Sequence, residues 1–395
     1  MLVSNFRKNW IKITLLLASS MTVMAGATIA PALPLISKEF AHVGDIVFLS
    51  KLILTIPGFF IAFTAPIAGF IIDKLGRKTM MLCGLICYGI AGSTGLYLDD
   101  VYSILIGRAF LGLSVGAIMT TASTLLGDYL RGEERDKFVG FQGAFIAGGG
   151  VFFVLLGGFL ADYSWRYPFA LYLTAIALVP VAYFALYEPD RARPNGTTGQ
   201  NDPAQDVAYS KQTVWFIYFL AFLVMTTFYM IPAQLPFWLR ELKVAKTNLE
   251  IGAVIAIANL SGAVASFNHA KFKRIMDYES IYGIIFLAMA VGMSLISVAH
   301  NYWMVVAGVV VAGLGTGLTM PNTNLWLMSV APIQLRGRIM GGVSAALFIG
   351  QFASPILSQP VSNYGGLGMM YGAFGGAMVL FAVGFMMNNL IKTLK

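Results

Sequence analysis

Charged residues are scarce in this sequence, where Asp, Glu, Lys and Arg make up only 11% of 395 residues. Water-soluble domains carry about 25% charged residues, so a soluble fold of this length would lack the side chains that normally cover its surface. Hydrophobic residues make up 58% instead, accompanied by 42 glycines. Lipid is the solvent that fits such a composition, and small residues let helices approach closely within it. We therefore expect an integral membrane protein embedded in a lipid bilayer.

Residues that form disulfides or bind metals are also few. The only two cysteines, Cys83 and Cys87, are four positions apart in an apolar run, where they are best interpreted as packing residues. The three histidines, His42, His269 and His300, are scattered and form no metal-ligand pattern. We expect no metal site and no bound cofactor.

The sequence lacks the groups that membrane-bound enzymes and nucleotide-driven pumps need. It has no Gly-x-x-x-x-Gly-Lys-Ser/Thr segment and no cluster of His and carboxylate residues near a membrane face. We therefore do not expect an enzyme. Asp and Glu are also absent from the middle of every long apolar segment, which argues against a cavity selective for cations.

Apolar segments long enough to cross a bilayer, which takes about 20 helical residues, occur twelve times. Their expected positions are 13–35, 47–72, 79–98, 101–127, 138–160, 166–187, 213–239, 249–270, 279–299, 302–330, 338–359 and 364–391. The expected fold class is an all-α membrane protein with twelve transmembrane helices. A polar segment at 188–212, rich in Pro and Gly, reads as a cytoplasmic linker between two six-helix bundles, 1–187 and 213–395.

The two halves also resemble each other in sequence. The fourth segment contains Gly112-Leu-Ser-Val-Gly-Ala-Ile-Met119, and the tenth contains Gly313-Leu-Gly-Thr-Gly-Leu-Thr-Met320. Parallel six-helix repeats around a central cavity are a known plan for transporters. Chance resemblance between glycine-rich helices is the alternative explanation.

Lys and Arg gather on one side of this arrangement. Of the 26 Lys and Arg residues, 19 fall on the side of the termini, six including Lys51 fall on the opposite side, and Arg108 falls inside a segment. Cytoplasmic loops carry such an excess, so we expect both termini in the cytoplasm. Attraction to anionic lipids then accounts for the net charge of +8 without nucleic acid as a partner.

The loop between the second and third segments carries a specific pattern. It reads Gly69-Phe-Ile-Ile-Asp73-Lys74-Leu-Gly76-Arg77-Lys78. At every defined position it resembles the loop motif of the major facilitator superfamily, Gly-x-x-x-Asp-Arg/Lys-x-Gly-Arg/Lys-Arg/Lys. A merely basic loop would account for the cations but not for the glycines and the acid at these spacings.

This resemblance implies a conformational latch. In the family the motif holds the two halves in the outward-open state, and its Arg, here Arg77, pairs with an acid at the end of the fourth helix, here Asp128. A glycine at 69 would let another helix approach, an acid at 73 would face that helix's N-terminus, and a glycine at 76 would permit a tight turn. The expected latch residues are Gly69, Asp73, Gly76, Arg77, Lys78 and Asp128.

Arg108 is the one basic residue expected within the membrane, where a charge costs at least about 2.5–3.5 kcal/mol. Arg108 and Gly112 resemble the family's motif in the fourth helix, although Leu111 replaces its usual Gln. The resemblance implies a role in coupling or in binding near the first helix. A structural role stays open, because the side chain could also extend toward the outer surface.

The fifth segment departs from the family's exporter pattern, Gly-x8-Gly-x3-Gly-Pro-x2-Gly-Gly. Phe153-Val154 replaces the central Gly-Pro, which weakens the resemblance to drug/proton antiporters. The residues that keep their places are Gly140, Gly149, Gly157 and Gly158. Helix packing is the alternative role of these glycines. Two weaker resemblances to the drug-exporter branch are Ala32-Leu33-Pro34 and Trp165-Arg166.

The family's arrangement implies that helices 1, 4, 7 and 10 line a cavity, with helices 2, 5, 8 and 11 beside them. Polar and aromatic residues of these segments are candidates for substrate binding or coupling. They are Arg108, Thr120, Gln142, Phe145, Tyr229, Gln234, Asn322, Asn324, Trp326 and Gln351. Further candidates for the cavity surface are Thr22, Thr28, Ser114, Thr226, Asn259, Met119, Met225 and Phe228.

The favoured function is that of a secondary active transporter that exports small neutral or anionic amphipathic molecules, resembling the drug-efflux branch. A proton gradient is the coupling source we consider. The alternative is an importer or facilitator of a small metabolite, which the lost Gly-Pro and the missing embedded acid favour. We expect a monomer in the inner membrane of a bacterium, with a small molecule as its substrate.

Overall fold

A computed structural model describes residues 5–189 and 209–394, leaving a few side chains within helices, such as that of Asp73, undescribed. Within these ranges the regular secondary structure is entirely helical. The first half contains α1 (Asn5–Ala27), η1 (Ala30–Ala32), α2 (Leu33–Glu39), α3 (Ile46–Leu75), α4 (Arg77–Gly92), η2 (Ser93–Leu96), α5 (Val101–Tyr129), α6 (Gly132–Ala161), η3 (Tyr167–Leu173) and α7 (Thr174–Ala185). The second half contains α8 (Lys211–Phe228), α9 (Met230–Glu241), α10 (Asn248–Lys273), α11 (Tyr278–Ser297), α12 (Tyr302–Val330), η4 (Ile333–Leu335) and α13 (Arg336–Leu394).

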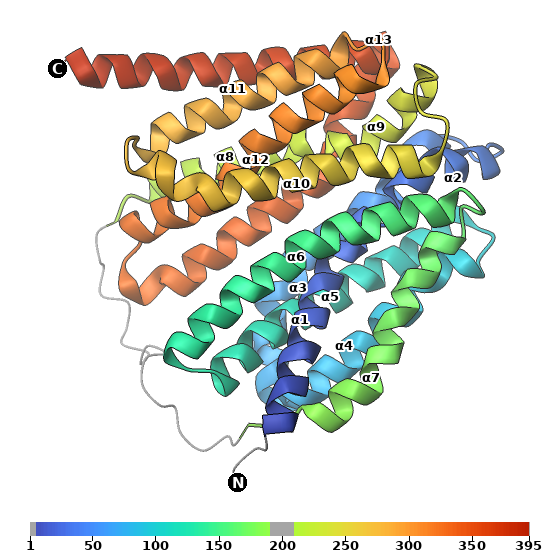
Figure 1. The fold of residues 1–395 in the computed structure, drawn as a ribbon, viewed down its shortest axis with the longest axis vertical. Helices are drawn as coiled ribbons and strands as arrows, with labels where there is room; N and C mark the ends of the chain where they lie inside the picture. Colours follow the sequence, from blue (N-terminus) through green and yellow to red (C-terminus); the bar gives the residue numbers. More distant parts are fainter. Residues whose placement is uncertain (1–4, 190–208, 395) are drawn as a thin grey trace.

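The predicted fold class is confirmed. Eleven helical stretches among the described residues are long and apolar enough to cross a membrane. The last of them, Arg336–Asn388, holds two of the predicted segments, because Gly366 leaves the helical conformation with φ 79° and the chain reverses there (Figure 1). The predicted loop near 360–363 is therefore helical, since a glycine at 366 makes the turn without polar residues.

The helices gather into two bundles, one from each half of the chain. Figure 1 shows the first-half helices below the second-half helices, with α6 beside α10 where the bundles meet. Helices α3 and α13 form a second contact between the bundles. The exact boundary stays a prediction, because residues 190–208 of the expected linker lie outside the described ranges.

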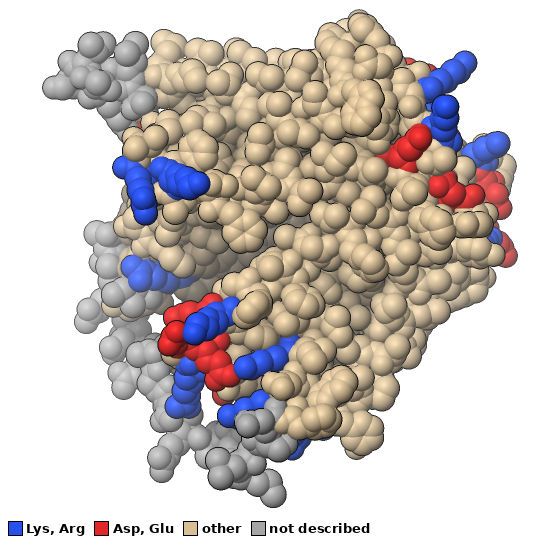
Figure 2. Space-filling model, in the orientation of Figure 1, with Lys and Arg blue, Asp and Glu red and all other residues tan. Residues whose placement is uncertain are grey.

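The molecule has two charged ends separated by a band of uncharged surface. Figure 2 shows Lys, Arg, Asp and Glu side chains at the left and right ends of this face, with uncharged residues between them. In Figure 1 the described chain begins at the bottom and finishes at the upper left, so both of its ends lie on the lower-left side; we call this side the terminal end and the opposite side the distal end. Large apolar side chains such as Phe70, 76% exposed, and Trp303, 74% exposed, need a lipid environment.

The bundles are joined by hydrogen bonds near the distal end. Asp162, at the end of α6, accepts hydrogen bonds from the backbone N–H groups of Asn248 (2.5 Å) and Leu249 (3.2 Å) at the start of α10. The Asn248 side chain donates in return to the carbonyl of Ala161 at 3.1 Å. A carboxylate at a helix N-terminus satisfies donors that have no partner within the helix and also opposes the helix dipole. Thr247 and Glu250 form the capping box of α10 itself, and Asp162 adds a cap for two further N–H groups from the other bundle.

Lys51 adds a second distal connection and corrects the expectation that it lies at the membrane surface. It is 1% exposed inside α3, and its Nζ donates to Gln359 Oε1 of α13 at 2.7 Å. The Nζ atom also lies 4.8 Å from the centre of the Phe237 ring. The contact between bundles covers this lysine, which the hydropathy pattern of α3 alone could not indicate.

Toward the terminal end, three glycines of α3, α6 and α13 lack such close packing. A methyl group added at Gly69, Gly140 or Gly341 would meet no atom within 4 Å. Figure 2 shows the surface hollowed between the bundles toward this end. The structure is therefore closed at the distal end and open toward the terminal end.

We predict that Asp162→Ala opens the distal end, because α10 loses a cap supplied by the other bundle. Loss of a cap costs about 0.5–2 kcal/mol, which should change the ratio of closed to open molecules by about 2- to 30-fold. Spin labels at positions 39 and 241, in a Cys83→Ser/Cys87→Ser background, would report the distance across the distal end. The matched control is Asp100→Ala, which removes a cap within one bundle, since Asp100 accepts from Ser103 N–H at 2.8 Å. An equal shift in both variants would contradict the prediction.

Candidate functional site

A cavity of about 520 Å³ lies between the two bundles. Residues of α1, α3, α5, α6, α8, α9, α10, α12 and α13 line it, which are the eight predicted segments 1, 2, 4, 5, 7, 8, 10 and 11. Its lining contains no Asp, Glu, Lys, Arg or His. Ligand pockets are typically apolar with a few polar groups, and this cavity fits that description.

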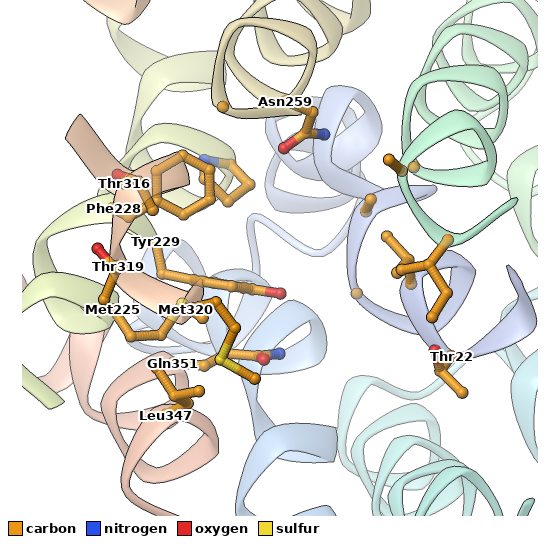
Figure 3. Close-up of a pocket in the computed structure, with 18 of the residues that line it drawn as sticks. Thr22, Met225, Phe228, Tyr229, Asn259, Thr316, Thr319, Met320, Leu347 and Gln351 are labelled. Atoms are coloured by element: carbon orange, nitrogen blue, oxygen red, sulfur yellow. The ribbon is translucent and has the colours of Figure 1, made fainter. Parts of the chain in front are cut away.

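The polar groups of the lining are few and uncharged. They are Thr22, Tyr229, Asn259, Ser266, Thr316, Thr319, Ser344 and Gln351. Figure 3 shows Tyr229 and Gln351 close together on one side, with Thr22 opposite and Asn259 at another edge. A methyl group added to Gly26 of α1 would lie 2.8 Å from Tyr229 Oη and 3.5 Å from Gln351 Nε2. A glycine at 26 thus gives these two polar groups of the second bundle room beside α1.

Of the ten main candidates, Tyr229 and Gln351 line the cavity and the others do not. Among the further candidates, five also line it: Thr22, Asn259, Met119, Met225 and Phe228. Thr28, Ser114 and Thr226 do not. Thr28 and Ser114 instead bond to the carbonyls one helical turn before them, those of Met24 and Phe110.

Three amide candidates are occupied by contacts between helices. Gln142 Nε2 donates to Ser19 Oγ at 2.7 Å, joining α6 to α1. Gln234 Nε2 donates to Ser358 Oγ at 2.7 Å, joining α9 to α13. Asn322 Nδ2 donates to the Tyr278 carbonyl at 3.0 Å. These side chains hold helices together, because polar groups in lipid find partners on neighbouring helices.

The remaining candidates also lie away from the cavity lining. Thr120 Oγ1 donates to the Gly116 carbonyl at 2.9 Å, and Phe145 is 43% exposed on α6. Trp326 is 7% exposed and stacks on Tyr278 with ring centres 6.0 Å apart. Asn324 Oδ1 is buried without a hydrogen-bond partner among the described residues, yet it is not part of the lining.

Arg108 is fully buried and is held by backbone carbonyls of two other helices. Its Nε donates to the Ile53 carbonyl of α3 at 2.8 Å, and its Nη2 donates to the Ala25 carbonyl of α1. Its guanidinium also lies 5.1 Å from the centre of the Tyr172 ring. A cation at this depth is thereby accommodated by hydrogen bonds and a ring face without a carboxylate.

Both carbonyls lack a partner within their own helices. A helical carbonyl bonds to the N–H four residues later, but residue 57, four after Ile53, is Pro57 and has no N–H. Ala25 lies in the last turn of α1, where carbonyls have no donor within the helix. Tyr172 Oη also donates to the Ala25 carbonyl at 3.2 Å. Arg108 thus completes the hydrogen bonding of two interrupted helices.

The loop motif lies at the terminal end, within the first bundle. Gly76 has φ 89°, a conformation that favours glycine, so it makes the tight turn between α3 and α4. Arg77 Nε lies 3.3 Å from Asp128 Oδ2, so the ion pair implied by the family resemblance is present. Lys78 Nζ lies 4.5 Å from the centre of the Tyr183 ring. The side chain of Asp73 lies outside what the structure describes, and Gly69 has no close neighbour in this conformation.

The sequence alone did not indicate the roles of two acidic residues, Glu188 beside the loop motif and Asp162 at the distal end. Glu188, which we assigned to the linker, accepts hydrogen bonds from the N–H groups of Arg77 (2.8 Å) and Lys78 (2.9 Å). It therefore caps α4 and ties the end of the first bundle to the motif. Asp162 caps α10 in the same way. In the sequence, the only sign of such a role is an acidic residue at the end of a segment. The sequence does not show which helix that residue would cap.

The glycines of the exporter pattern have packing roles, against α1 and the residue after it within the first bundle at Gly149 and Gly157, and against α10 of the second bundle at Gly158. A methyl group at Gly157 would lie 2.0 Å from the Thr28 carbonyl oxygen, and one at Gly158 would lie 2.6 Å from that of Asn248. One at Gly149 would lie 3.0 Å from Ser20 Cβ. Close helix packing explains these three positions, while Gly140 has no atom within 4 Å.

Comparisons with known proteins agree with this architecture. A family model described as Major Facilitator Superfamily matches residues 15–277, and one described as Sugar (and other) transporter matches residues 205–389. The class H tetracycline resistance protein of Pasteurella multocida is 22% identical over 94% of this chain and 95% of its own. Multidrug resistance protein 1 of Bacillus subtilis (strain 168) is 26% identical over 74% of this chain and 75% of its own. The inward open structure of the xylose transporter XylE from E. coli has the same fold, with a TM-score of 0.75 at 15% identity over 95% of each chain.

We predict that Arg108→Met destabilises the protein by roughly 1–3 kcal/mol, because the buried Ile53 carbonyl loses its donor while the Ala25 carbonyl keeps the Tyr172 hydroxyl. Pro57→Ala restores an N–H four residues after Ile53, so it should recover about 1 kcal/mol in the Arg108→Met protein. Thermal unfolding of the purified single and double variants in detergent would measure this coupling.

Pro180→Ala is the matched control, because Pro180 interrupts α7 rather than α3. It should not rescue Arg108→Met. Additive effects of Arg108→Met and Pro57→Ala would show that the two residues do not share the Ile53 carbonyl.

Proposed function

Because this chain belongs to the major facilitator superfamily, we propose that it is a secondary active transporter that works by alternating access and exports small neutral or anionic amphipathic molecules. The observation that carries the proposal is the uncharged, largely apolar cavity between two bundles that are joined distally. A molecule could enter it from the terminal end, and breaking the distal contacts would release the molecule at the other side. The transported molecule leaves chemically unchanged.

The composition of the cavity supports the substrate class. A volume of about 520 Å³ is suited to a small molecule, and an apolar lining favours a substrate with apolar surface. Thr22, Asn259 and Gln351 offer hydrogen bonds at separate places, which suits an amphipathic molecule. An organic cation would find no carboxylate in the lining, while Arg108 adds positive charge behind Ala25.

The distribution of Lys and Arg supports one orientation of the protein in the membrane. We propose that the terminal end faces the cytoplasm of a bacterial cell, because it carries most of the Lys and Arg residues. The open cavity would then load substrate from the cytoplasm, as export requires. We further propose a monomer in the inner membrane that is coupled to a proton gradient.

The region around the loop motif suggests which contacts stabilise the state that is closed at the terminal end and open at the distal end. Asp162 and Lys51 join the bundles in this conformation, whereas Arg77, Asp128 and Glu188 interact within the first bundle. We propose that closing the terminal end brings a second-bundle helix against the motif. The open surroundings of Gly69 leave room for this approach.

Import of a metabolite such as a sugar is the second candidate. The match of residues 205–389 to the sugar transporter family favours it. The cavity favours it less, because a sugar presents many hydroxyl groups and the eight polar residues of the lining are spread over a largely apolar surface. Export of amphipathic molecules is therefore our first choice.

Counterflow in proteoliposomes tests the proposal. Vesicles loaded with unlabelled tetracycline, the compound named for one relative, should take up labelled tetracycline without any gradient. A neutral probe such as chloramphenicol and an anionic dye extend the test to the proposed class, and xylose tests the alternative. Exchange of xylose alone would replace the first candidate by the second.

We also predict that Asn259→Asp changes the charge preference of the cavity. A carboxylate in this apolar lining should weaken exchange of an anionic probe at least about 10-fold and introduce exchange of an organic cation. Asn301→Asp is the control, because Asn301 caps α12 outside the cavity, and aspartate is an equally good cap. Unchanged charge preference in Asn259→Asp would remove Asn259 from the substrate path.

A further inference from the structure

A second apolar hollow, which we call the outer groove, lies on the outside of the second bundle. Helices α10 and α11 both pack against α12 and hardly touch each other, so α12 forms the floor of a groove between them (Figure 1). The outer groove has a volume of about 570 Å³, and of the residues that line it only Asn268 and Lys271 are polar. The Asn268 amide donates back to the Val264 carbonyl at 2.8 Å. Lys271 is therefore the one charged group of the lining.

Helices α10 and α12 separate the outer groove from the cavity between the bundles. On α12, Leu314 and Leu318 line the outer groove, whereas Gly313 and Gly317 line the cavity. On α10, positions 264, 265 and 268 line the outer groove, and positions 262, 263 and 266 line the cavity. Val264 is 51% exposed and Leu314 is 39% exposed. The outer groove thus opens to the surroundings of the bundle and not to the transport path.

The outer groove extends from the terminal end toward the middle of the membrane. Lys271 lies in the last turn of α10, and Val264 lies seven residues before it, about 10 Å further toward the distal end by helical rise. One leaflet contributes about 15 Å to the hydrocarbon thickness of a bilayer. The molecules that surround such a groove are lipids, and an unfilled groove would forfeit the dispersion contacts of its walls.

Lys271 gives the terminal end of the outer groove a positive charge that is not already engaged. Its side chain is exposed and forms no hydrogen bond or ion pair within the part of the chain that the structure describes. Lys273, by contrast, donates to the Met276 carbonyl at 3.2 Å and lies 3.8 Å from the centre of the Tyr278 ring. Figure 2 shows Lys and Arg side chains gathered at the left of the molecule, where α10 ends in Figure 1.

The carboxylates of the neighbouring helices have other partners. At the start of α11, Asp277 accepts a hydrogen bond from the Ser280 N–H at 2.8 Å, and Glu279 accepts one from the Asn388 side chain at 2.6 Å. Helix α12 contains neither Asp nor Glu, and the lining of the outer groove contains none either. The groove therefore combines an apolar interior with a single cation at the membrane surface.

We propose that the outer groove binds an anionic phospholipid of the leaflet at the terminal end, with the phosphate beside Lys271 and an acyl chain along Leu314 and Leu318. Basic sites between helices near a membrane surface attract anionic headgroups. Every phospholipid offers an acyl chain to the apolar part of the groove, so the charge at Lys271 decides which lipid binds most tightly. The proposal depends on the fold alone and holds for any transported molecule.

Native mass spectrometry of the purified full-length chain tests this assignment. The protein is titrated in detergent with phosphatidylglycerol, which is anionic, or with phosphatidylcholine, which carries no net charge, and the dissociation constant of each lipid is measured. One lysine near the membrane surface should favour the anionic lipid by about 5-fold. Lys271→Gln should therefore bind phosphatidylglycerol about 5-fold more weakly and phosphatidylcholine as before, whereas Lys271→Arg should behave like the wild type.

A second variant tests the apolar part of the outer groove. Val264→Trp places an indole at the opening of the groove, so it should weaken the binding of both lipids. Thermal unfolding in detergent without added lipid certifies that each variant is folded. If Val264→Trp is not folded, Leu314→Trp takes its place, because Leu314 is also an exposed residue of the lining.

Lys211→Gln is the matched control, because Lys211 begins α8 outside the outer groove and should bind both lipids like the wild type. An equal loss of phosphatidylglycerol binding in Lys211→Gln and Lys271→Gln would overturn the assignment and show only a general attraction to the basic surface. Displacement of phosphatidylglycerol by inorganic phosphate would show an anion site without a lipid groove. A dimer that Val264→Trp dissociates while lipid binding stays unchanged would assign the groove to a second copy of the chain.

Discussion

Within a bilayer, every backbone N–H and C=O must find its partner inside the protein, and this requirement governs where polar side chains go. Pro57 and the end of α1 leave the carbonyls of Ile53 and Ala25 without helical donors, and Arg108 supplies them. Asp162 meets the same need for the N–H groups that begin α10. The interruptions of the helices thus fix the positions of the most conspicuous charged residues.

The same requirement explains why the cavity is so weakly polar. Gln142, Gln234 and Asn322 are each engaged by a neighbouring helix, so they stabilise helix contacts instead of facing the cavity. What remains at the cavity surface is apolar or uncharged, with Tyr229 and Gln351 beside Gly26. For the proposed function, such a lining would select substrates by shape and apolar contact rather than by ion pairing.

Much of the fold could be predicted because it depends on local features. The length of the apolar segments predicts the membrane-crossing helices. The glycine at 76, directly before Arg77, predicts the turn of the loop motif. The site could be predicted only in part, because an amphipathic helix does not reveal which neighbour its polar face meets. Tyr229 and Asn322 both carry a polar group within an apolar segment, yet only Tyr229 lines the cavity. The burial of Lys51 likewise depends on α13, some 300 positions away.

A transporter of the proposed kind needs its two ends to be balanced in free energy. The distal contacts comprise a few hydrogen bonds, from Asp162, Asn248 and Lys51, each worth about 1 kcal/mol net and more where a charge takes part. A ligand can shift a two-state equilibrium only by its difference in affinity for the two states. The hydrogen bonds across the distal end are few and modest, so a small molecule or a single proton would be enough to shift the balance between the two ends.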